Sequence, residues 1–133
     1  MRTVILILII TMLCCCKKKG NEFNDATNNL VNRWELRASV GGFAGTIIYE
    51  PGNGSIVEFK SDHSFINYEK GNIIRSGTYD LQTTSDKDQF KLTTITDTYN
   101  QSQNIILKKD TLVFLSPQSC CDMPDNTYVR LRK

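Results

Sequence analysis

The fold of this chain is decided by residues 55–83, which read SIVEFKSDHSFINYEKGNIIRSGTYDLQT. Apolar side chains recur there at every second position, as in Tyr79 and Leu81. This period of two is typical of a β-strand with one buried face. Short polar turns at 61–63 and 70–72 divide the stretch into three strands, and turns this short join antiparallel neighbours. The stretch therefore predicts an antiparallel meander.

The same pattern continues on both sides of this stretch and predicts eight or nine strands. The run 45–50 is the weakest of them and has the alternative of a lid loop. Parallel pairing would need long crossovers, for which the short turns leave no room. A meander of this length removes its edges by closing on itself, so we expect residues 30–133 to form one all-β domain, a single antiparallel up-and-down β-barrel of about eight strands. The expected strands are 31–40, 45–50, 55–60, 64–70, 73–83, 89–95, 103–108, 111–116 and 127–132.

Alternation also predicts which side chains face the barrel interior. The charged residues between them, such as Glu35, Arg37 and Glu58, are expected to face water. Residues 72–75 are apolar on both faces, which leaves their outer side either covered or exposed. The expected core consists of Trp34, Leu36, Val57, Phe59, Gly77, Tyr79, Leu81, Phe90, Leu92, Ile105, Leu107, Leu112 and Phe114.

The first nineteen residues have the form of an export signal. A basic start and an apolar run from Val4 to Leu13 fit a secretory signal, and the run is shorter than the ~20 residues of a spanning helix. The cysteine cluster that follows resembles the lipobox of bacterial lipoproteins, in which a cysteine becomes the acylated N-terminus. Cys16 fits best because Leu13 stands three residues before it. Cys15 is a weaker candidate, and an uncleaved anchor is the alternative.

The lipobox resemblance implies a signal peptide over 1–15 and a chain held to membrane lipid through Cys16. The implied location is the bacterial cell envelope, at the outer membrane and facing the periplasm. Residues 16–29 are polar and rich in asparagine, so we expect the acylated N-terminus to continue as a flexible tether.

Several short motifs recur in the same order in the small lipocalin-like lipoproteins of Gram-negative bacteria. They are Leu30 to Leu36, Gly41 to Gly45, Glu50-Pro51, Val57 to Phe59 with Asp62, Gly77 to Leu81, Asp110 to Leu112, and Tyr128 to Arg130. The chain resembles this family over nearly its whole mature length. The resemblance implies that Trp34 closes the barrel floor and that Arg130 or Arg132 stacks on its indole. Asn32 stands where the family has a glycine.

Composition and motif content exclude several functions. From Gly20 onward the chain has 12 Lys and Arg against 14 Asp and Glu, so it lacks the basic stripe of a nucleic-acid binder. His63 is the single histidine and falls in a polar turn, which argues against a catalytic triad and a multi-histidine metal site. We therefore expect no enzyme activity, no cofactor and no nucleic-acid partner.

Two functions remain after these exclusions. The first is binding of a small apolar or amphipathic ligand, and the second is an interaction protein with a filled barrel that docks on another envelope protein. The glycine-rich loop from Gly41 to Pro51 is either a lid over the barrel or a plug in it. The aromatic residues of the strands, including Phe65, either fill the barrel or line its cavity. The candidate ligand-binding residues are Phe43, Ile47, Tyr49, Phe59, Tyr79, Phe90 and Phe114.

Cys120 and Cys121 are adjacent in sequence and have no other thiol partner in the mature chain. An oxidising periplasm favours a disulfide between them, although adjacent Cα atoms lie closer than the usual disulfide span. A pair of buried thiols is an equal alternative, and a soft-metal site is the least favoured.

Overall fold

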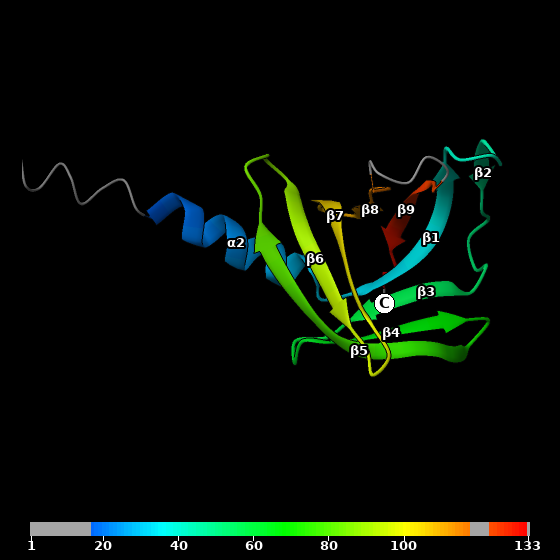
Figure 1. Ribbon diagram of the computed structural model, residues 1–133, viewed down its shortest axis with the longest axis horizontal. Coiled ribbons are helices and arrows are strands. Elements are labelled where there is room, and N and C mark those ends of the chain that lie inside the picture. Colours follow the sequence, from blue (N-terminus) through cyan, green and yellow to red (C-terminus); the bar gives the residue numbers. More distant parts are fainter. Residues whose placement is uncertain (1–16, 118–122, 133) are drawn as a thin grey trace, which may run out of the picture.

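The computed structural model describes residues 17–117 and 123–132, and that part of the chain forms a helix followed by nine strands (Figure 1). The elements are α2 (Lys17–Leu30), β1 (Arg33–Val40), β2 (Thr46–Ile48), β3 (Ser55–Phe59), β4 (Ser64–Glu69), β5 (Asn72–Thr83), β6 (Gln89–Ile95), β7 (Asn100–Lys108), β8 (Thr111–Phe114) and β9 (Asp125–Arg130). Each strand expected from the alternation is present, with ends that shift by a few residues.

The sheet closes into a barrel through its first and last strands. From β3 to β9 each strand pairs antiparallel with the next, while β1 pairs with β3 along one edge and with β9 along the other. The β1–β9 pairing sets Trp34 opposite Arg130, and its register shifts at a bulge between Leu36 and Ala38. Eight strands thus form a closed antiparallel barrel, which confirms the predicted fold class.

Strand β2 lies outside this closed set. Its three residues pair with Ala38–Val40 of β1, beyond the part of β1 that pairs with β3. The loop that contains β2 does not plug the barrel, because the side chain of Phe43 is 92% exposed and that of Ile47 is 39% exposed. The plug alternative for this loop is therefore wrong.

The core agrees with the predicted inward positions. Leu36 and Phe114 are only partly buried, and Phe114 packs against the core. Phe65 and, from α2, Ala26 and Leu30 join it. The buried apolar residues are Ala26, Leu30, Trp34, Val57, Phe59, Phe65, Tyr79, Leu81, Phe90, Leu92, Ile105, Leu107 and Leu112.

The prediction that Glu35 faces water is wrong, because its side chain is only 2% exposed. The chain that follows β2 turns back over it. The backbone N–H of Gly52 donates a hydrogen bond of 2.9 Å to Glu35 Oε1, and Arg37 Nε lies 3.2 Å from Glu35 Oε2. A buried carboxylate needs such partners. Alternation along a strand predicts which face of the sheet a side chain lies on. It does not predict whether another segment of the chain covers that side chain.

The expectation of a flexible tether is also wrong for residues 17–29, which are helical. Phe23, Ala26 and Leu30 follow one another at spacings of three and four, so they form one stripe on the helix. Ala26 and Leu30 are buried in the core and Phe23 packs against it. In the sequence, only these three apolar residues indicate a helix with a buried face, because the residues around them are polar.

Candidate ligand site in the rim half of the barrel

The two ends of the barrel differ in what they carry. Helix α2 packs at one end, where the turns 60–63, 84–88 and 109–110 also lie, and we call this the helix end (Figure 1). The opposite end carries the loop 41–54 and the turns 70–71 and 96–99, and we call it the rim end. Because the strands run up and down, each inward-facing row of side chains leads from one end to the other.

Along these rows the inward residues change from apolar to polar toward the rim end. Strand β5 runs from Leu81 and Tyr79 through Gly77 to Arg75, and β6 runs from Leu92 to Thr94. The rows on three other strands change in the same way, whereas β8 stays apolar from Leu112 to Phe114. The three rows are Phe65 to Asn67 on β4, Leu107 and Ile105 to Gln103 and Gln101 on β7, and Tyr128 to Asn126 on β9.

A cavity of about 210 Å³ lies between these rows. Its apolar wall belongs to the core, and its polar wall carries one cation and no acidic side chain among the described residues. The lining residues are Val57, Phe59, Phe65, Asn67, Arg75, Leu92, Thr94, Gln101, Gln103, Phe114, Asn126 and Tyr128. This volume is below the range typical of drug-sized ligands, so the cavity suits a small molecule or one end of a longer one.

Arg75 is the charged group of the cavity, and its guanidinium makes two hydrogen bonds and two contacts with aromatic rings. Its Nη1 donates to Gln101 Oε1 at 3.3 Å and its Nη2 donates to Thr94 Oγ1 at 2.9 Å. The guanidinium also lies over two rings, 5.4 Å from the centroid of Phe65 and 4.8 Å from that of Tyr99. These contacts fix the position of the cation.

Two polar atoms of the cavity lining have no hydrogen-bond partner among the described residues. They are Nε of Arg75 and Oδ1 of Asn67, and both are buried. The two residues face each other across β4 and β5. Buried polar groups are normally satisfied, so this pair is an exception beside the cavity.

Tyr128 also lines the cavity, with its ring packed edge-on against Phe114 at a centroid distance of 5.3 Å. Burial raises the pKa of Tyr128, and the nearby groups of Tyr49 and Glu69 act in the same direction. The phenol therefore stays neutral in the physiological range, and it leaves Arg75 as the source of charge in the cavity.

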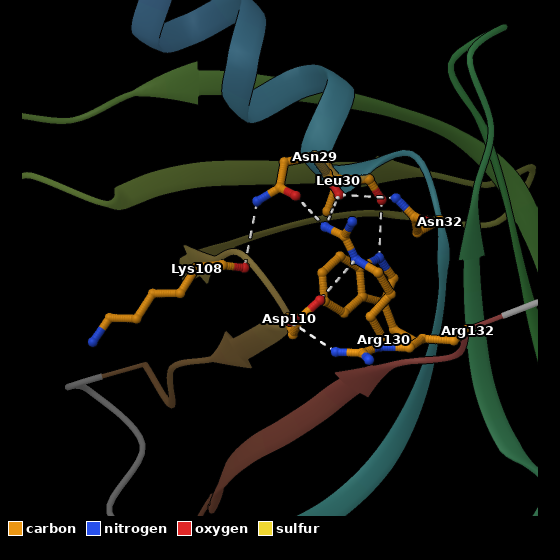
Figure 2. Close-up of polar contacts among 8 residues, drawn as sticks. Asn29, Leu30, Asn32, Lys108, Asp110, Arg130 and Arg132 are labelled. Atoms are coloured by element: carbon orange, nitrogen blue, oxygen red, sulfur yellow. Dashed lines mark hydrogen bonds and ion pairs between the residues drawn. The ribbon is translucent and has the colours of Figure 1, made fainter.

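A packed cluster around Trp34 lies at the helix end, and Figure 2 shows Arg130 and Asn29 within it. The indole is fully buried, and its Nε1 donates to the carbonyl of Leu30 at 2.9 Å. Arg130 lies 5.1 Å from the centre of this ring and donates to both the carbonyl and the side-chain oxygen of Asn29. The predicted stacking is therefore confirmed for Arg130.

This cluster also ends the helix. The last carbonyls of a helix have no partner within it. Here the carbonyl of Asn29 accepts from Arg130 and from Asn32 Nδ2, the latter at 3.2 Å. Arg130 brings a positive charge to the negative end of the helix dipole. Asn32 thus serves as a capping side chain. Arg132 lies outside the cluster, 85% exposed and 3.6 Å from Asp110.

The predicted ligand residues divide into three groups. Phe59 and Phe114 line the cavity. Tyr79 and Phe90 are buried in the core and are not among the residues that line it. The loop residues Phe43, Ile47 and Tyr49 lie at the rim end but do not line the cavity either.

The polar residues of the site were missed because the sequence reasoning looked for aromatic and apolar contacts. The signal was present in the alternation itself. Arg75 continues the inward row of Gly77, Tyr79 and Leu81, and Gln103 continues that of Ile105 and Leu107. An arginine in an inward position of a small barrel points to a polar interior.

His63 occupies an exposed turn, as expected, in the left-handed conformation with φ 64°. Its ring stacks on Tyr79 at a centroid distance of 5.4 Å. The hydroxyl of Tyr79 donates to the carbonyl of Lys60 at 2.9 Å, and burial, then the charge of Asp62, raises its pKa. These contacts give both residues a structural role.

A second hollow of about 1070 Å³ lies outside the barrel, between α2 and the turn that joins β5 to β6. Charged side chains such as Asp86, Lys87 and Lys108 are exposed on its walls. It arises because the helix projects from the barrel (Figure 1), and it lacks the enclosing walls of the interior cavity.

Some predicted residues lie outside the described part of the chain. These are Cys16, Cys120 and Cys121, so their acylation and pairing stay predictions. Within residues 17–117 and 123–132, no three or more His, Cys, Asp or Glu side chains gather as metal ligands would. The single helix in those ranges lacks the length and apolar character needed to span a membrane.

Comparison of the chain with protein-family models, with curated proteins and with solved structures finds no match.

Proposed function

We propose that this protein is a membrane-anchored, lipocalin-like lipoprotein whose barrel binds a small amphipathic molecule in the cell envelope. The interior cavity of about 210 Å³ is the observation that carries the proposal. It has apolar residues such as Val57 and Leu92 on one side and polar residues such as Asn67 and Arg75 on the other. A filled barrel would have no reason to place polar side chains with unpaired atoms in its interior.

The position of the anchor supports the same proposal. Helix α2 begins at Lys17, directly after the proposed acylation site Cys16, and it packs at the helix end of the barrel. The cavity lies toward the rim end. A lipid anchor at one end thus leaves access to the cavity unobstructed at the other.

Native mass spectrometry of the protein purified from its own envelope tests ligand binding. We expect a small molecule to stay with the barrel and to be lost when the cavity is filled by Gln103→Phe. The matched control is Gln82→Phe, because Gln82 is exposed on the outer face of β5. A wild-type protein that retains nothing, or equal retention by both variants, would contradict the proposal.

Acyl labelling tests the anchor separately. Cys16→Ala is expected to leave an unprocessed precursor without label, while Cys15→Ala keeps the label. Persistent labelling of the Cys16→Ala protein would show that the site is wrong.

A second candidate function, docking on an envelope protein, is favoured by the exposed apolar residues. Those in the described part of the chain all lie toward the rim end: Val40, Phe43, Ile47, Ile48, Ile73, Ile74, Ile95, Tyr99 and Met123. Such a concentration is typical of an interaction surface. A protein that copurifies with the wild type and is lost on Phe43→Ser and Ile74→Ser, together with an absence of retained small molecules, would favour docking over ligand binding.

A further inference from the structure

Resting on the proposed binding function, we propose that the ligand of the interior cavity is an organic anion, and that its carboxylate binds the guanidinium of Arg75. The cavity then holds the apolar part of the ligand near the core and its charged group toward the rim end. This assigns a chemical class to the ligand and a role to Arg75.

The charge of the cavity is the first argument. Arg75 is partly buried and is the only charged residue among those that line the cavity. Among the described residues, no carboxylate lies within ion-pair distance of it. A buried charge is costly unless it is paired. An anionic ligand supplies that pair, whereas a cationic ligand would be repelled.

The hydrogen-bonding state of Arg75 is the second argument. Thr94 and Gln101 are neutral acceptors, and they take one hydrogen each from Nη2 and Nη1. The Nε hydrogen has no acceptor among the described residues. A guanidinium binds carboxylate through parallel N–H donors, and this fork is strongest when it is fixed beforehand. The rings of Phe65 and Tyr99 provide that fixation.

The arrangement of the lining sets the orientation and size of the ligand. Leu92 and Phe59 lie on the core side of the cavity, and Arg75 and Asn67 lie on the rim side. The volume corresponds to roughly seven water molecules of the liquid. A short-chain carboxylate, or the head of a longer one, therefore fits with its apolar chain directed toward Leu92.

Calorimetric titration of the wild-type protein with three probes of equal chain length tests the proposal. The probes are hexanoate, 1-hexanol and hexylamine, which is cationic at neutral pH. We expect hexanoate to bind at least about tenfold more tightly than 1-hexanol, because a hydrogen bond to a charged group is worth about 1.5 kcal/mol or more. Hexylamine should bind more weakly than either. Equal or tighter binding of the alcohol or the amine would overturn the proposal.

Two substitutions locate the effect. Arg75→Met is expected to remove the preference for hexanoate over 1-hexanol. The matched control is Arg33→Met, since Arg33 also lies over a ring, 5.5 Å from the centroid of Tyr68, but is exposed outside the barrel. A folded Arg75→Met protein that still prefers hexanoate would overturn the role of Arg75.

A further variant guards against loss of folding in Arg75→Met. Asn67→Asp has nearly the same shape and places a carboxylate opposite Arg75, so it should weaken hexanoate binding at least about tenfold and weaken 1-hexanol binding less. In the wild type, the Nε–Hε resonance of Arg75 should shift with hexanoate only. An unmoved resonance at saturation would contradict contact with this nitrogen.

The outcomes separate this inference from the binding function. If no probe binds and the purified protein retains no small molecule, the binding function itself is wrong. If 1-hexanol binds as well as hexanoate, or if the retained molecule is neutral or cationic, ligand binding stands and the anionic class is wrong.

Discussion

The same strands form an apolar core at the helix end of the barrel and line a cavity at its rim end. At the helix end, inward positions hold Trp34, Leu81 and Leu107, which form one apolar core with Ala26 and Leu30 of α2. At the rim end, the same inward rows hold Arg75 and Gln103 around a cavity. The strands alternate inward and outward side chains in both halves, although the rim half also has register shifts at Leu36/Ala38 and Asn67/Tyr68. The chemical identity of the inward residue, and not its direction, therefore decides whether the interior is core or site.

This difference divides stability from binding. Apolar burial contributes about 25 cal/mol per Å² removed from water, so the helix end stabilises the fold. The rim half buries less apolar surface, because polar groups lie inside it, and therefore contributes less to the stability of the fold. Proteins commonly concentrate such losses where they bind ligands. The following variants test how sharply the two halves differ.

The largest loss of stability is expected for substitution of Trp34, in the core at the helix end. Trp34→Ala removes a fully buried indole together with the contacts of Leu30 and Arg130. We expect a loss of about 3–5 kcal/mol in the free energy of unfolding, measured by urea denaturation. An unchanged midpoint would contradict both the burial of Trp34 and its role in closing the barrel.

The next test compares two register partners across the border between the halves. Leu92 and Gln103 face each other on β6 and β7, and Leu92 is only 1% exposed. Leu92→Ala should cost about 2–5 kcal/mol, whereas Gln103→Ala should cost less than about 1 kcal/mol because Gln103 is polar and only partly buried. Equal losses in thermal unfolding would break the distinction between core and site.

Gly77 lies between the halves on β5. A Cβ at this position would overlap the carbonyl oxygen of Ile95 and approach Phe65 to 3.1 Å. Gly77→Ala is expected to destabilise the fold by about 1–3 kcal/mol. Hydrogen exchange would show whether the amides of β5 and β6 lose protection first. A Gly77→Ala variant with unchanged stability would mean that β5 and β6 can move apart without loss of free energy of unfolding.

The smallest expected effect distinguishes the two C-terminal arginines. Arg130→Met removes the stacking on Trp34 and the bonds to Asn29, so it should cost about 2 kcal/mol. Arg132→Met should change stability by less than about 0.5 kcal/mol, because its side chain is exposed. A larger loss from Arg132→Met than from Arg130→Met would reverse the assignment of the stacking residue.

Much of this fold was predictable because strand alternation and short turns are local signals. Ten of the expected inward residues, from Trp34 to Leu112, are buried as predicted. The helix was not predicted, because its packing depends on three apolar residues whose partners lie in the distant strands. The burial of Glu35 was not predicted either, since it depends on how the chain near Gly52 folds back.

The candidate site was predicted only in part. The rim end as the place of the cavity agrees with the position of the Gly41–Pro51 loop, and Phe59 and Phe114 line it. The loop residue Phe43 points to solvent instead. Arg75 escaped notice because a single charged residue in a strand is usually assigned to the outer face. The contacts of Arg75 come from β4, β6 and β7 together. The sequence around Arg75 alone does not predict these contacts.

The pairing of β1 with β9 has a further consequence, for the time at which the barrel forms. Trp34 on the first strand pairs with Arg130 on the last, so this contact joins residues far apart in sequence. Pairing between segments far apart in sequence is slow, and β-barrels of this kind fold over milliseconds to seconds. Until β9 is present, β1 keeps a free edge that can pair with another chain. We therefore expect the contact that closes the barrel to be among its slow folding steps.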